Sequence, residues 1–84
     1  MSEQLFVFLC KQEVIEYVKL RFDEQLNEDQ IYVAWLCQIL PNRKVLISTT
    51  LLDGMYYEIT YNGVSQEFYV DAYKKVDNYV KCVS

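Results

Sequence analysis

Two turn signals, Asp53-Gly54 and Asn62-Gly63, constrain this chain most, and they contain its only two glycines. Asp-Gly and Asn-Gly pairs favour the backbone angles that tight hairpin turns require. The segment between them, "MYYEITYN" at 55–62, is rich in tyrosine and β-branched residues, which is typical of a strand. A strand enclosed by two such turns predicts consecutive hairpins, and therefore an antiparallel meander.

Periodicity along the rest of the chain predicts a single α+β domain, residues 1–84. The predicted architecture is an N-terminal helix, a four-stranded antiparallel β-meander and a C-terminal helix. Ser2 and Asp71 are the expected N-caps of the two helices. The first helix is apolar nearly all round in its first turns, so we expect it to be covered on more than one side. The predicted bounds are 3–25 and 71–82 for the helices, and 31–40, 44–51, 55–62 and 64–70 for the strands.

One register satisfies all three hairpins and places the apolar residues on one face of the sheet. It needs a two-residue turn at Asn62-Gly63 and three-residue loops at 41–43 and 52–54. The first helix is expected to cover this face. The predicted core face consists of Val33, Trp35, Cys37, Ile39, Val45, Ile47, Leu51, Met55, Tyr57, Ile59, Tyr61, Val64, Phe68 and Val70.

The opposite face is also largely apolar on the first two strands, but it is mixed on the last two. In the predicted register Tyr56 lies opposite Tyr69, and Glu58 lies opposite Glu67. Two interpretations remain open for this face. The C-terminal helix covers it, or part of it is open and binds another chain.

Two groups of acidic residues have a structural and a functional interpretation each. Glu58 and Glu67 are either two solvated side chains, a weak metal pair or a docking point for a basic group. The run Asp23, Glu24, Glu28, Asp29 is either a solvated loop or an electronegative patch that docks on a basic protein.

Composition excludes several classes of function. The net charge of −4 and the pI near 4.6 argue against direct nucleic-acid binding. The chain has no histidine and no glycine-rich phosphate loop, so an enzyme, a cofactor site and a metal site are not expected. No apolar run is long enough to span a membrane. Three cysteines without a C-x-x-C pair indicate reduced thiols, with Cys10 and Cys37 expected to be buried and Cys82 exposed.

The segments Ser48-Thr49-Thr50, 53–58, Tyr61-Asn62-Gly63 and 71–75 resemble a family of small uncharacterised proteins from phages and prophages of Gram-positive bacteria. The resemblance covers about residues 30–78. Members of that family often have a proline beside the Asp-Gly turn, where this chain has Leu52. The resemblance implies that the protein is located in the cytoplasm of a bacterium during infection or lysogeny. It identifies no functional residue in this chain.

We therefore expect a non-catalytic phage protein that binds and inhibits a bacterial host protein. A defence nuclease is the most concrete target, which would make the chain anti-CRISPR-like. The alternative is a self-associating accessory or structural protein, with a homodimer interface on the first helix or on the Leu36/Leu46 face. The candidate contact residues are Glu28, Asp29, Leu36, Leu46, Tyr56, Glu58, Glu67 and Tyr69.

Overall fold

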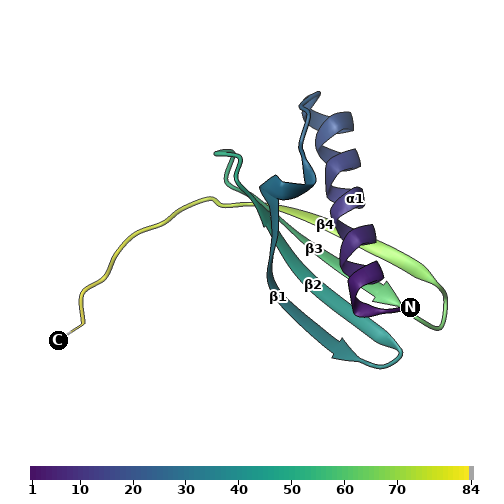
Figure 1. Cartoon of the computed structure of the whole chain (residues 1–84). Coiled ribbons are helices and arrows are strands. Elements are labelled where there is room, and N and C mark those ends of the chain that lie inside the picture. The colour runs from purple at the N-terminus through teal and green to yellow at the C-terminus, as the bar shows by residue number, and fades with distance from the viewer. Residues whose placement is uncertain (84) are drawn as a thin grey trace.

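A computed structural model, which describes residues 1–83, has one long helix lying against a four-stranded antiparallel sheet (Figure 1). The strands follow one another in the order β1-β2-β3-β4, so the predicted meander is confirmed. The predicted α+β class and N-terminal helix are confirmed as well. The elements are α1 Glu3–Phe22, the short 3-10 helix η1 Glu28–Gln30, β1 Ile31–Ile39, β2 Asn42–Thr49, β3 Met55–Asn62 and β4 Glu67–Lys74.

Helix α1 begins at the predicted cap and ends earlier than predicted. The Ser2 hydroxyl accepts a hydrogen bond from the Leu5 amide at 3.1 Å, which satisfies one of the free N–H groups of the first turn. The helix ends after Phe22, because Asp23 adopts a left-handed φ of 53° and its amide donates to the Lys19 carbonyl. The expected continuation to residue 25 is therefore wrong.

A single face of α1 is buried, so the expectation that the helix is covered on several sides is also wrong. Leu5, Phe8 and Leu20 are exposed on the rest of its circumference. The buried residues are four apart and pack on the central strands β2 and β3, whose inward side chains complete the core. The core consists of Phe6, Cys10, Val14, Val18, Leu26, Ile31, Val45, Ile47, Tyr57 and Ile59.

The three hairpin loops differ in length from the predicted ones. The β1–β2 turn is the two-residue pair Leu40-Pro41, the β2–β3 loop spans 50–54, and the β3–β4 loop spans 63–66. The side chain of Asn62 accepts hydrogen bonds from two amides of the last loop, those of Val64 and Ser65, which stabilises the longer turn.

The residue pairs between strands change with the loop lengths, but most residues keep their predicted side of the sheet. Tyr57 pairs with Ala72 rather than Phe68, a slip of four residues, and Ile47 pairs with Tyr57 rather than Ile59, a slip of two. Side chains alternate with a period of two, so an even slip leaves each residue on its predicted side of the sheet. On β2, β3 and β4 the predicted faces are therefore right even though the predicted partners are wrong.

Strand β1 changes faces in its middle. A bulge at Ala34 shifts the register, so that Val33 pairs with Ile47 and Leu36 pairs with Val45. After the bulge Trp35, Cys37 and Ile39 point away from α1, and Leu36 points towards it. Their predicted orientations were the reverse, and the exposed Cys37 corrects the expectation of a buried thiol.

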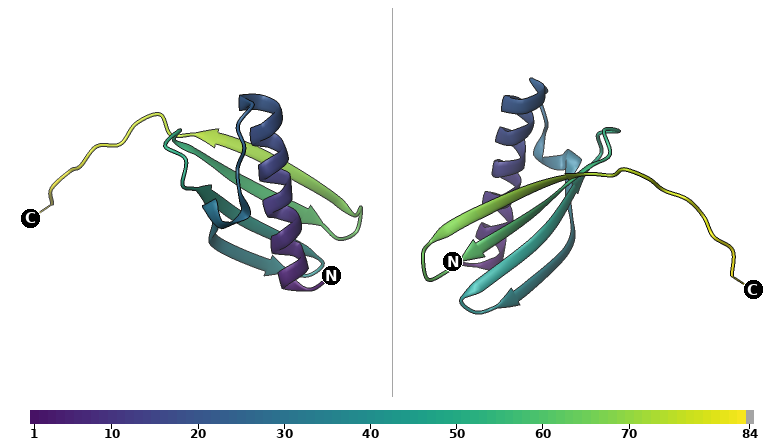
Figure 2. Two further views of the ribbon diagram at one scale, coloured as in Figure 1. Left: turned by 45° about the horizontal axis from the view of Figure 1, so that its top comes forward. Right: turned by 180° about the vertical axis from the view of Figure 1, so that it is seen from behind.

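No helix follows the sheet in the described residues. Strand β4 continues to Lys74, through the position predicted to cap the second helix, and residues 75–83 form an irregular segment, here called the arm. The arm runs away from the sheet rather than over it (Figure 1). The sheet face turned away from α1 carries no helix or strand, as the view from behind shows (Figure 2). Of the two interpretations above, coverage of this face by a C-terminal helix is wrong.

Candidate functional site

The face of the sheet turned away from α1 is a candidate functional surface, and we call it the open face. The register assigns it one residue in two along each strand. It consists of Tyr32, Trp35, Cys37, Ile39, Asn42, Lys44, Leu46, Ser48, Tyr56, Glu58, Thr60, Asn62, Glu67, Tyr69, Asp71 and Tyr73.

Five aromatic side chains stand on the open face, at least one on each of β1, β3 and β4. Tyr32, Trp35, Tyr56, Tyr69 and Tyr73 are each between 38% and 52% exposed. The rings of Tyr56 and Tyr73 stack with their centroids 5.2 Å apart and their planes inclined by 15°. Such a pair holds its own geometry and leaves its outer surface free, so it forms a rigid apolar platform for a partner.

The centre of the open face is acidic. Glu58 pairs across the ladder with Asp71, and it forms an ion pair with Lys44 at 3.2 Å between Nζ and Oε1. The carboxylates of Asp71 and Glu58 raise the pKa of the neighbouring Tyr73 hydroxyl. One lysine does not neutralise two carboxylates, so the platform has an electronegative centre. The opposing pair predicted from the sequence was Glu58 with Glu67, and Glu67 instead lies at the far end of β4 opposite Asn62.

A shallow hollow of about 350 Å³ lies at the end of the open face near the β1–β2 turn. Its floor is formed by Trp35 and Cys37 of β1, with Lys44 and Thr60 beside them. The Trp35 ring is therefore within reach of a partner that fills the hollow.

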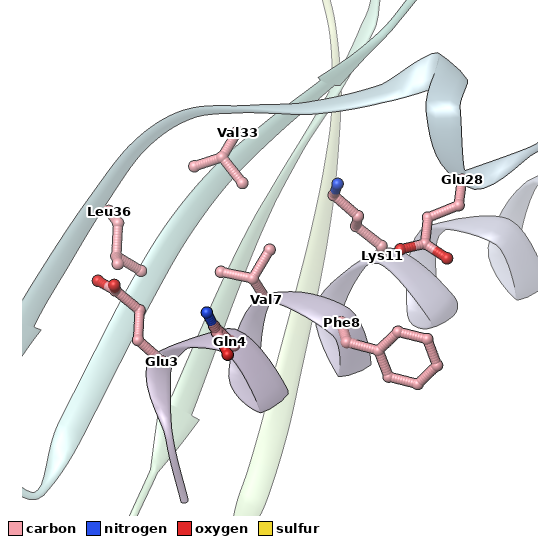
Figure 3. Close-up of a pocket in the computed structure, with 8 residues that line it drawn as sticks. All are labelled: Glu3, Gln4, Val7, Phe8, Lys11, Glu28, Val33 and Leu36. Atoms are coloured by element: carbon pink, nitrogen blue, oxygen red, sulfur yellow. The ribbon is translucent and has the colours of Figure 1, made fainter.

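A second concave surface lies on the other side of the sheet. It is a groove of about 420 Å³ between α1 and β1, lined by Val7, Phe8, Val33 and Leu36 with charged side chains at its ends (Figure 3). Glu28, at the start of η1, closes one end of it. This groove has one exposed aromatic side chain, Phe8.

The structure brings together five of the eight residues predicted as contacts. Leu46, Tyr56, Glu58, Glu67 and Tyr69 share the open face, with Glu67 at its far end, and Tyr56 lies opposite Tyr73 rather than opposite Tyr69. The remaining three are apart from this group. Leu36 and Glu28 line the groove on the α1 side, and Asp29 is exposed beside Glu28.

Sequence reasoning missed Trp35, Cys37, Asp71 and Tyr73 as surface residues. For the last two a signal was present. From 67 to 74 the sequence "EFYVDAYK" alternates polar or aromatic residues with Phe, Val and Ala, which is the period of a half-exposed strand. For Trp35 no signal existed, because "IYVAWLC" is apolar throughout and does not show where the bulge falls.

The open face offers aromatic rings, three carboxylates, one ammonium group and one thiol. Residues 1–83 hold no group of three or more cysteine or acidic side chains placed to share a metal ion. The Cys10 thiol is enclosed in the core, where burial, with a smaller effect from Glu13, raises its pKa to about 12. A thiol with such a pKa is not a nucleophile near neutral pH. Within the described part of the chain, no helix has the length and apolarity that a membrane span requires.

Comparisons with known proteins give one match. No curated protein and no solved structure matches the chain. A model of the family of unknown function DUF6275 matches residues 7–83, a range that includes the whole sheet, nearly all of α1 and the arm. The chain therefore belongs to the family of unknown function DUF6275.

Proposed function

We propose that this chain is a non-catalytic binding module, and that its open face is the contact surface for a protein of a bacterial host. The observation that carries the proposal is the uncovered aromatic platform around Tyr56 and Tyr73. Large aromatic side chains that gather half-exposed on one face of a small domain are typical of an interaction surface. Tyrosine and tryptophan are also the residues that most often dominate the binding energy of protein interfaces.

The acidic centre of the open face favours a partner with a basic group. Glu58 and Asp71 attract a basic group, and the flanking tyrosines present ring faces on which an arginine guanidinium stacks. The chain as a whole carries a net charge of −4, so its field also favours encounter with a basic protein. The partner we propose is therefore a protein with an exposed arginine-rich surface.

The resemblance to phage and prophage proteins of Gram-positive bacteria supports the host cytoplasm as the compartment of the binding that we propose. The basic proteins that a phage benefits from blocking there include nucleases of the host defence, whose nucleic-acid channels are lined by Lys and Arg. An acidic module that occupies such a channel excludes the nucleic acid by competing for the same cations. Inhibition of a defence nuclease, in the manner of an anti-CRISPR protein, is the most specific form of this proposal.

Capture of partners from a Gram-positive bacterial lysate tests the proposal with matched surface variants. The wild-type chain is compared with Tyr56→Ala/Tyr69→Ala, which removes two rings from the open face, and with Phe8→Ala, which removes one ring from the groove. We expect one host protein to be retained by the wild type and by Phe8→Ala, and lost with the double variant. Retention by the double variant and loss with Phe8→Ala would move the contact surface to the groove. Retention of no host protein by any of the three chains would refute the proposed function.

Self-association is the second candidate function, and one observation favours it. The arm carries four large apolar side chains, Val76, Tyr79, Val80 and Val83, each between 78% and 97% exposed. An isolated monomer gains nothing by keeping these side chains in water.

A further inference from the structure

The arm has the residue pattern of a helix that packs on a surface. Its exposed apolar residues, Val76, Tyr79, Val80 and Val83, are spaced at i, i+3, i+4 and i+7, which places them on one side of a helix. A helix of nine residues is not stable alone in water, because too few hydrogen bonds offset the cost of its nucleation. The arm therefore becomes helical only where a surface receives its apolar side.

The open face matches the arm in size and in charge. A nine-residue helix is about 13 Å long, and four strands spaced about 4.8 Å apart span about 14 Å from the first to the last. The apolar side of such a helix meets the aromatic platform. The arm carries two lysines, Lys75 and Lys81, and one acidic residue, Asp77, so its net charge of +1 is opposite in sign to that of Glu58 and Asp71, the acidic pair at the centre of the face.

The arm does not reach the open face of its own molecule. Its first amide, that of Lys75, donates to the Gly54 carbonyl at 2.8 Å, which fixes the direction in which the arm leaves β4. From there it runs outwards, away from the sheet (Figures 1 and 2). A return to its own sheet needs a reversal at Asp77-Asn78, the turn-forming residues of the arm. That reversal would divide the arm and interrupt the helical spacing of its apolar residues.

We propose that the arm of one molecule packs as a helix across the open face of a second copy, and that the exchange is reciprocal. Two-fold symmetry makes the same patch and the same arm meet twice, so the assembly closes as a dimer. Each copy contributes about twenty residues from its arm and its face, which is the number found in an interface of standard size. This inference rests on the open face being a binding surface, as the proposed function has it.

Reciprocal exchange also regulates the proposed host contact. The arm covers Trp35, Tyr56 and Tyr73, which are the residues that a host protein would contact. Host protein and arm therefore compete for one surface, and a chain that lacks the arm binds the host protein at least as tightly as the full chain.

The test is the mass of the protein in solution, measured by light scattering across a concentration series in reducing buffer. Four chains are compared: the full chain, a chain that ends at Lys75, Val80→Ser in the arm, and Val64→Ser as a matched control in the β3–β4 loop. Val80 and Val64 are 86% and 81% exposed in the single molecule, so the two substitutions have the same chemistry and equivalent starting exposure. We expect a dimer for the full chain and the control, a monomer for the truncated chain, and a dimer dissociation constant at least tenfold higher for Val80→Ser.

Quenching of the fluorescence of Trp35, the only tryptophan of the chain, adds a local measurement. We expect acrylamide to quench the truncated chain more strongly than the full-length dimer, because the arm of the partner covers this ring. A dimer that persists after truncation would overturn the proposal in favour of an interface on α1 or on a sheet edge. A full chain that stays monomeric at high micromolar concentration would also overturn it. This holds whether acrylamide quenching shows Trp35 to be shielded by the arm of its own molecule or not shielded at all.

The same chains separate this inference from the proposed function. Loss of host capture by all chains, with dimer formation as expected, would refute the host contact and leave the arm exchange in place. A monomeric full chain that still captures a host protein through Tyr56 and Tyr69 would refute the arm exchange and leave the host contact in place.

Discussion

Strand β2 provides a direct test of whether the open face is uncovered within one molecule. Its neighbouring residues Leu46 and Ile47 are similar in size but point to opposite sides of the sheet. Ile47 is completely buried beneath α1, whereas Leu46 is half-buried among the side chains of the open face. Replacing each by alanine removes a comparable amount of apolar side chain from two different environments. We make both substitutions in the full chain and measure at a protein concentration below the dimer dissociation constant, so that the arm of a second molecule does not contribute.

The expected costs differ several-fold. Ile47→Ala leaves a cavity in the core and lowers the free energy of unfolding by about 2–5 kcal/mol. Leu46→Ala leaves space that water fills, and its cost is about 1 kcal/mol or less. A domain of this size has a total stability of roughly 4–12 kcal/mol, and 1 kcal/mol shifts its melting temperature by about 4–8 °C. Urea and thermal unfolding, followed by circular dichroism, therefore resolve the two variants. Equal destabilisation by Leu46→Ala and Ile47→Ala would refute the conclusion that the open face is uncovered in the monomer.

Four further outcomes follow from the core, the α1 contact and the β3–β4 loop. Cys10 should resist thiol reagents at pH 8 in the folded protein while the two exposed cysteines react, and three fast thiols would contradict its burial. The pKa of Cys10 and of Tyr57 is raised to about 12 by burial in the fold, with smaller contributions from neighbouring groups, so both stay protonated there more readily than in the unfolded chain. Their contribution to stability is present below about pH 9 and is lost towards pH 12, which urea unfolding at increasing pH would show. Arg43→Gln removes hydrogen bonds of 2.6 and 3.1 Å to the carbonyls of the first two residues and a contact with the Phe6 ring, so we expect a loss of about 1–2 kcal/mol and faster amide exchange in the first turn of α1. Gly63→Ala places a methyl group against the backbone of the β1–β2 turn and should destabilise the domain by about 1–3 kcal/mol in the same unfolding assay.

Local patterns predicted the strands and the meander because both depend on short-range signals. Gly54 has a φ of 70°, as the predicted Asp-Gly turn requires. Asn62-Gly63 marks the second chain reversal but does not form the predicted two-residue turn, because Asn62 ends β3 and its side chain hydrogen-bonds a four-residue loop. These local signals do not determine which residues pair between neighbouring strands. A turn pair shows where the chain reverses, but the number of loop residues depends on contacts across the sheet. Gly63, for instance, lies against Pro41 in the neighbouring turn.

The boundary between β4 and the arm was mispredicted because two periods overlap there. Ala72 and Val76 fit a helical stripe with the later apolar residues, while Val70 and Ala72 fit the alternation of a strand. Pairing with β3 decides the competition as far as Lys74, where Met55 is the last partner. Beyond that row β3 has no residue left to pair with, so the strand stops and the helical period of the arm is left without a surface.

The errors at Trp35, at Cys37 and in the arm share one physical cause. Trp35 and Cys37 were assigned to the core, and the arm was assigned to a covering helix, because apolar residues are normally expected to be buried within their own chain. The structure leaves these residues exposed, and all of them lie on the open face or on the arm. A helix and four strands have already filled one core, so the excess apolar surface has no partner in the same molecule. In the arm exchange that we propose, a second molecule buries these segments. The residues of the open face among them also belong to the host contact that we propose.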